Sequence, residues 1–126
     1  MRELRPNTQA GRLLRILVRR YPEWSNVEHF GYDGYSCRNR MDDALGVRGF
    51  KIARQAIVRE DGKKLARYEW RLATEEIYHR AALLVRSWDT GEDFATLVER
   101  DPLLARLRER TQGDVAGAGQ EDLFAG

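Results

Sequence analysis

The sequence predicts an α+β fold in which several helices surround one β-hairpin. Helix-spaced apolar residues occur before residue 21 and again after residue 74. Between them lie two strand-like segments, Phe50–Arg59 and Lys64–Leu72, separated by Glu60-Asp61-Gly62-Lys63. Asp-Gly between such segments is a strong hairpin signal, because a tight type I′ turn needs positive φ at both central residues.

A chain of 126 residues has room for one domain with a modest core and an accessory element. No apolar run approaches the roughly 20 residues that span a bilayer. The first residues, Met-Arg-Glu-Leu-Arg-Pro, lack the apolar stretch of a secretory signal. The single cysteine excludes an internal disulfide framework. These features predict a cytoplasmic protein without a membrane partner.

The net charge of +2 conceals an asymmetry along the chain. Residues 1–72 contain 16 Lys or Arg and 9 Asp or Glu, whereas residues 73–126 contain 6 and 11. A basic first part and an acidic second part indicate a polyanion-binding unit followed by a segment with a different task. An ordinary domain with unevenly charged surfaces would show the same counts.

Two helices are expected at the start of the chain. Asn7 or Thr8 can cap the first, which runs to about Arg20 with a leucine-rich stripe. The string Ser25-Asn26-Val27-Glu28 matches a capping box and opens a short second helix that ends at Phe30.

A third helix is expected to start near Tyr35 or Ser36 and to end at Gly46 or Gly49. Steps of 100° divide it into two sides. The expected core side carries Cys37, Met41, Ala44 and Leu45. The opposite side carries Ser36, Asn39, Arg40 and Asp43, with Arg38 and Asp42 on the flanks. Such a polar side suits a helix that lies in a DNA groove, and it equally suits a helix that simply faces water.

For the hairpin, a two-residue Asp61-Gly62 loop predicts the register. The expected pairs are Ala53–Trp70, Arg54–Glu69, Gln55–Tyr68 and Glu60–Lys63. The expected buried face consists of Ala53, Ile57, Tyr68, Trp70 and Leu72. Arg54 and Glu69 would form an ion pair on the other face. Arg59, Lys63 and Lys64 would lie near the tip, free to meet phosphate.

After the hairpin, Thr74 caps an expected helix over Glu75–Trp88, and further helices begin near Phe94 and at Asp101-Pro102. They either pad the domain or present an apolar face to a partner, including a second copy of the chain through residues 74–110. From residue 111 the chain is Gly/Ala-rich and is expected to form a flexible tail. The predicted division is therefore 1–73, 74–110 and 111–126.

The order of three helices and a hairpin resembles the winged helix-turn-helix family, especially its small phage and bacterial members. The likeness covers residues 8–72, and the matching positions are Arg40-Met41, Leu45, Gly49-Phe50, Ile52, Gly62 and Tyr68–Leu72. Gly46 and the pair Asp42-Asp43 depart from the family pattern. The resemblance implies a winged-helix domain, with the hairpin as its wing, followed by a C-terminal helical extension and the tail.

The resemblance also implies double-stranded DNA binding by a nucleoid-associated regulatory or replication factor of bacterial or phage origin. Ser36, Asn39 and Arg40 would face base edges in the major groove. The residues expected to contact phosphates are Arg38, Arg59, Lys63, Lys64 and Arg67. A winged helix used only for protein contacts is the other interpretation.

A second resemblance lies in the string Gln120-Glu121-Asp122-Leu123-Phe124, which is similar to the pentapeptide by which bacterial replication and repair proteins bind the sliding clamp. It implies that Gln120, Leu123 and Phe124 contact the clamp, with Glu121 in place of the usual leucine. The alternative function is therefore an adaptor or a phage inhibitor of host replication that docks on the clamp. Leu123 and Phe124 packing onto the chain's own domain is the simpler interpretation.

No pattern indicates an enzyme, a cofactor or a metal centre. His29 and His79 are far apart in the sequence, and Glu76-Ile77-Tyr78-His79 is a single copy of a spacing that carboxylate di-iron sites need twice. Cys37 lies on the apolar side of its helix with no histidine positioned as a base.

Overall fold

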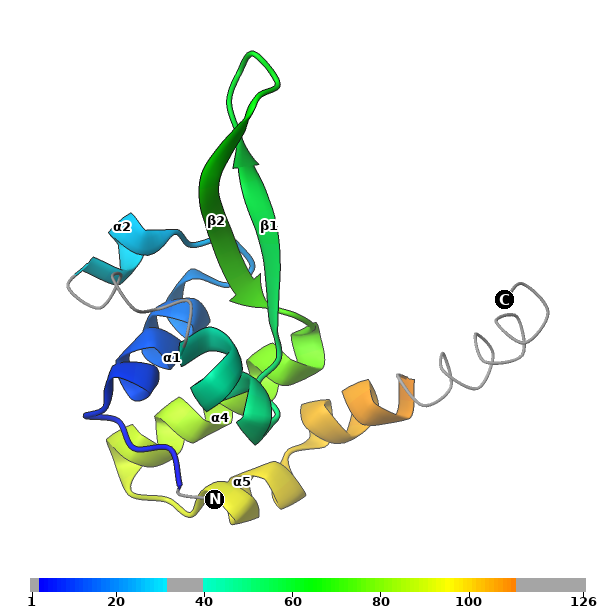
Figure 1. Ribbon diagram of the computed structural model, residues 1–126. Helices are drawn as coiled ribbons and strands as arrows, with labels where there is room; N and C mark the ends of the chain where they lie inside the picture. Colours follow the sequence, from blue (N-terminus) through cyan, green and yellow to red (C-terminus); the bar gives the residue numbers. More distant parts are fainter. Residues whose placement is uncertain (1–2, 32–39, 111–126) are drawn as a thin grey trace.

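The computed structural model describes residues 3–31 and 40–110 (Figure 1). Its first helices are α1 (Gln9–Arg20) and α2 (Val27–Phe30), followed by a π-helical turn η2 (Met41–Leu45) and a 3-10 turn η3 (Gly46–Arg48). The antiparallel strands β1 (Ile52–Val58) and β2 (Lys64–Leu72) form a two-stranded hairpin. The remaining elements are α4 (Glu75–Thr90), α5 (Phe94–Arg100) and a helix over 102–110.

The helices gather at one end of the hairpin, and the hairpin projects from them so that its turn stands clear of the body (Figure 1). This mixture of helices and one antiparallel hairpin confirms the predicted α+β class. Among the described residues, no helix has the length and the apolar character needed to cross a membrane.

Several predicted helix boundaries are confirmed by side-chain caps. Thr8 accepts from the Gly11 N–H at 3.1 Å, and Thr74 accepts from the Ile77 N–H at 3.1 Å. Asp101 accepts from the Leu104 N–H at 2.9 Å and so caps the last helix. The second helix is different, because its cap is Asn26 rather than Ser25.

Ser25 is unavailable as a cap because it forms a short bridge with Trp70 of β2. The capping box that the sequence indicated is formed one residue later. The Asn26 side chain accepts from the His29 N–H at 3.4 Å, and His29 Nδ1 accepts from the Asn26 N–H at 3.0 Å.

One apolar core unites the helices and the start of the hairpin. The large side chains that are fully buried in it come from α1, η2 and β2 and include Leu13, Leu14, Leu17, Met41, Leu45 and Leu72. Ala81 and Leu84 of α4 belong to the same core, and Tyr78 stacks on Tyr21 with ring centroids 4.3 Å apart. The predicted inward positions Met41 and Leu45 are therefore confirmed, and α4 packs against α1.

The hairpin register differs from the predicted one. Ile52 pairs with Leu72 and Gln55 with Glu69, one residue away from the expected partners. Two features near the turn produce this register. The Arg59 N–H donates to the Lys63 carbonyl at 2.8 Å and the Gly62 N–H to the Arg59 carbonyl at 2.9 Å, which makes a three-residue loop. The register then shifts between Val58, which pairs with Lys64, and Ala56, which pairs with Tyr68. Gly62 has φ of 83° whereas Asp61 does not have positive φ, so the predicted type I′ turn is wrong.

The changed register also changes which side chains meet. Trp70 and Leu72 are buried as predicted, but Tyr68 is 36% exposed, and Ala53 lies on the opposite face because it pairs with Arg71. The predicted Arg54–Glu69 ion pair is wrong. Glu69 accepts from Gln55 at 2.6 Å, and Arg54 lies over the Tyr68 ring at 4.5 Å from its centroid.

Candidate nucleic-acid interface

The base of the hairpin is fixed to the body by backbone and side-chain contacts. Ser25 and Trp70 exchange two backbone hydrogen bonds, both 2.8 Å long, so the segment between α1 and α2 pairs with β2. Phe30 of α2 packs on the Trp70 ring at a centroid distance of 6.1 Å. The direction in which the hairpin leaves the body is therefore set by core residues.

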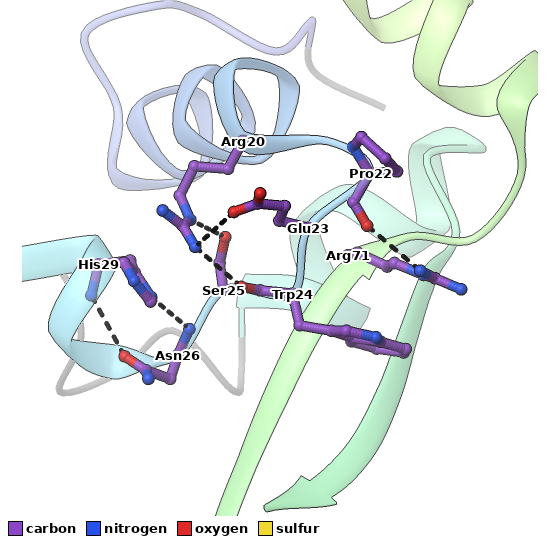
Figure 2. A network of polar contacts seen from close by, with 8 residues as sticks. All are labelled: Arg20, Pro22, Glu23, Trp24, Ser25, Asn26, His29 and Arg71. Atoms are coloured by element: carbon purple, nitrogen blue, oxygen red, sulfur yellow. Dashed lines mark hydrogen bonds and ion pairs between the residues drawn. The ribbon is translucent and has the colours of Figure 1, made fainter.

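Figure 2 shows the polar network that joins the end of α1 to this base. The Arg20 guanidinium donates to the Ser25 hydroxyl at 2.8 Å and to the Trp24 carbonyl at 3.0 Å, and it lies 3.7 Å from a Glu23 carboxylate oxygen. The Arg20 side chain thus contacts three consecutive residues of the connection between α1 and α2, and Ser25 is completely buried there.

Arg71 extends the same network to the hairpin. It donates to the Pro22 carbonyl at 3.2 Å, and its guanidinium lies 4.4 Å from the Trp24 ring centroid (Figure 2). Because these contacts use the cation to fix the connection, Arg71 serves mainly to position the hairpin.

The outer part of the hairpin carries its cations in exposed positions. Over residues 52–72 the sequence has six basic and three acidic residues. Arg59 lies 3.5 Å from Asp61, with the two side chains 57% and 45% exposed. Arg67 lies 3.7 Å from Glu28 of α2, with 63% and 77% exposure. Lys63 is exposed, and its ammonium meets no partner among the described residues.

The structure does not bring all the predicted DNA contacts together. Arg40, at the start of η2, is exposed and donates through Nε to Gln9 Oε1 at 3.0 Å. It thus lies against the beginning of α1, whereas Arg59 and Lys63 belong to the turn at the far end of the hairpin (Figure 1). Asp42 and Asp43 next to Arg40 are also exposed.

The other predicted site residues lie outside the described part of the chain. These are Ser36, Arg38 and Asn39 in the third helix, and Gln120, Leu123 and Phe124 in the tail. The Lys64 side chain also lies outside it, although its backbone pairs with Val58 in the hairpin. Groove reading by the third helix and clamp binding by the tail therefore stay predictions.

One cation of this surface was missed in the sequence because of the register. Arg54 is exposed and stacks on Tyr68 instead of pairing with Glu69, so it adds an exposed cation to the hairpin, on the face of Tyr68 and Trp70. The alternation of the strand did not reveal this, because the register, which shifts between Ala56 and Val58, decides which face each side chain takes.

Away from the hairpin, His79 of α4 contacts Asp101 with a distance of 2.9 Å between Nε2 and Oδ1. The Leu104 N–H, helped by His79, holds the pKa of the Asp101 carboxyl below its usual range. This pair connects α4 to the last helix. Within residues 3–31 and 40–110, no group of three or more His, Cys, Asp or Glu side chains is arranged to hold a metal ion.

Comparisons of this chain with protein-family models, with curated proteins and with solved structures found no match.

Proposed function

We propose that this protein binds double-stranded DNA and that the hairpin is the element that lies along the phosphates, as the wing of a winged helix. The observation that carries the proposal is the projecting hairpin, which bears Arg59, Lys63 and Arg67 on exposed positions of its outer part and an exposed Arg54 nearer its base. Phosphate contacts of this kind supply most of the affinity of a protein for duplex DNA and orient it on the helix.

The acids beside these cations do not prevent phosphate binding. The Asp61 and Glu28 partners of Arg59 and Arg67 are well exposed, and the contacts are 3.5 and 3.7 Å long. Ion pairs of this type stabilise a protein by about 0–1 kcal/mol, because water and salt screen them. A DNA phosphate can therefore replace either carboxylate at little cost, and the guanidinium groups are already held on the correct element.

The arrangement of elements supports the winged-helix form of the proposal. Two helices, a further helical segment ending in η3 and an antiparallel hairpin follow one another in the order that the family resemblance implies. The bridge between Ser25 and Trp70 adds a pairing outside the hairpin that ties it to the segment between the first two helices.

An electrophoretic mobility-shift series at several salt concentrations tests this function. The informative variant is Arg59→Gln/Lys63→Gln, because both side chains are exposed and their loss leaves the core untouched. Each phosphate contact contributes about 0.9 to the slope of log affinity against log salt. We expect the double variant to bind more weakly and to lower that slope by about 1 to 2 at an unchanged melting temperature.

The matched control is Arg100→Gln/Arg106→Gln, which removes two exposed positive charges from α5 and the last helix. It should bind like the parent. If the hairpin variant keeps the parent's affinity and salt slope, or if the control weakens binding equally, the hairpin is not the phosphate-contacting element.

A further inference from the structure

A second basic site lies apart from the outer hairpin, in a hollow of about 760 Å³. Its walls come from the chain that precedes α1, from the beginning of α1 and from the helical turns η2 and η3. Among the described residues, three arginines line it, Arg5, Arg40 and Arg48, against one carboxylate, Glu3. Such an excess of positive charge in a concave surface favours the binding of an anion.

Arg40 is held in a way that leaves its outer end available. Its Nε donates to Gln9 Oε1 at 3.0 Å, and the two terminal nitrogens have no partner within the described part of the chain. These two nitrogens form the fork that binds two oxygens of one anion. The contact with Gln9 also fixes the plane of the guanidinium, which reduces the conformational freedom lost on binding.

Arg5 is fixed through its backbone. Its carbonyl accepts from the Thr8 hydroxyl at 2.7 Å, and it packs so closely over Gly11 that a Cβ on Gly11 would lie 2.1 Å from that oxygen. Glycine at position 11 is therefore required for the chain to cross α1 at this point. The crossing places Arg5 on the wall of the hollow, where its side chain is exposed.

Arg48 completes the wall from η3. Its Nη1 donates to the Ala44 carbonyl one turn earlier, so the side chain folds back along the helical turn instead of extending into water. It is half-buried, which makes its charge less screened than that of a fully exposed arginine.

We infer that this hollow binds a phosphate or phosphate-ester group between Arg5, Arg40 and Arg48. Planar guanidinium groups match the oxygens of a tetrahedral phosphate, whether it is a singly charged diester or a doubly charged monoester. A hollow of this volume also has room for more than the phosphate itself, as in a nucleotide.

The phosphate can come from two sources, a small phosphorylated compound or the backbone of DNA. Only the second source rests on the proposed function. Thr8, Gln9 and Ala10 at the start of α1 line the hollow. The start of α1 lies away from the turn of the hairpin (Figure 1). Changes at the two places can therefore be made independently.

The first part of the test uses inorganic phosphate as the probe, followed by 15N NMR at constant ionic strength. We expect saturable shifts of the Arg40 Nε–H and of the amides around residues 5–10. Arg5→Gln should weaken phosphate binding about tenfold or more, because a hydrogen bond to a charged group contributes about 1.5–3 kcal/mol. Arg106→Gln, which removes an exposed charge elsewhere, should leave it unchanged.

The second part measures the affinity of Arg5→Gln for a 16-base-pair duplex. A loss for both phosphate and duplex identifies a DNA phosphate in the hollow, and a loss for phosphate alone identifies a small phosphorylated ligand. Shifts that do not saturate, or equal phosphate affinity for the parent and Arg5→Gln, would overturn the inference. Arg59→Gln/Lys63→Gln should retain phosphate binding in the hollow. A failure of the hairpin proposal can therefore be distinguished from a failure of the inference about the hollow.

Discussion

The base and the tip of the hairpin belong to one element but have opposite surroundings. At the base, Trp70 and Leu72 are 5% and 0% exposed and the strand pairs with Ser25. At the tip, Val58 is 55% exposed and every residue from 59 to 63 is exposed. The base therefore contributes to stability, and the proposed binding involves the opposite end. Substitutions at the base should unfold the protein, whereas substitutions at the tip should alter only what it binds.

The largest effect is expected at the base, from Trp70→Ala. Trp70 packs on Phe30 and belongs to the core, so its truncation should lower the free energy of unfolding by about 3–5 kcal/mol. Urea unfolding followed by circular dichroism measures this. Val58→Ala is the comparison at the exposed outer end and should change stability by less than about 0.5 kcal/mol. Equal losses for the two variants would erase the distinction between base and tip.

A smaller effect is expected from Ser25→Ala. The buried hydroxyl accepts from Arg20 Nε, and its removal leaves that donor without its partner at a cost of about 1–3 kcal/mol. The backbone bridge to Trp70 does not depend on the side chain and should persist. Thermal unfolding measures the loss of stability. Ser25→Thr, which keeps a hydroxyl, should lose less stability than Ser25→Ala. A Ser25→Ala protein as stable as the parent would show that this network does not anchor the hairpin.

At the tip, Gly62→Ala tests the three-residue loop. Nothing lies within 4 Å of an added Cβ, so the only penalty is the positive φ of 83°, about 1–2 kcal/mol for an ordinary residue. Gly62→Asn should cost less, because asparagine tolerates this conformation better. Chemical denaturation distinguishes the two. A large loss of stability for both variants would indicate that the tip packs against other residues.

The smallest effect is expected far from the hairpin and only in acid. The lowered pKa of Asp101 means that the folded state favours the carboxylate. Its stabilisation is therefore present above the usual value of about 3.9 and is lost as the pH falls through the lowered value. Amide exchange at pH 5 and pH 3 should show residues 102–110 opening before the hairpin base, which is held by apolar contacts and backbone bonds. Asp101→Asn, which keeps a capping oxygen, should not show this early opening at pH 3. If residues 102–110 open early at pH 3 in both proteins, Asp101 is not the cause.

The sequence predicted the elements better than their connections. Thr8, Thr74 and Asp101 were recognisable because a capping side chain acts on neighbours three residues away. The hairpin was recognisable from Asp61-Gly62, but its register was not, because glycine with positive φ fits both a two-residue and a three-residue loop. The further shift between Ala56 and Val58 has no sequence signal, and it places Arg54 opposite Trp70 instead of Glu69.

Long-range partners were also beyond the reach of sequence patterns. Ser25 resembled a helix cap, yet it pairs with Trp70, which lies 45 positions further along the chain. Arg5 and Arg48 showed no motif, because the hollow they line forms only when the N-terminal segment crosses α1 at Gly11. Contacts of this kind depend on how the elements pack against one another, and periodicity and capping rules do not predict that packing.

Addition of a short DNA duplex to 15N-labelled protein, followed through the backbone amide shifts, tests the role of the hairpin most directly. If the anchored hairpin presents its tip to phosphates, the largest salt-sensitive shifts should fall on residues 59–63, with smaller ones at Arg54 and Arg67. Shifts concentrated on α5 and residues 102–110, with residues 59–63 unaffected at saturation, would contradict the account.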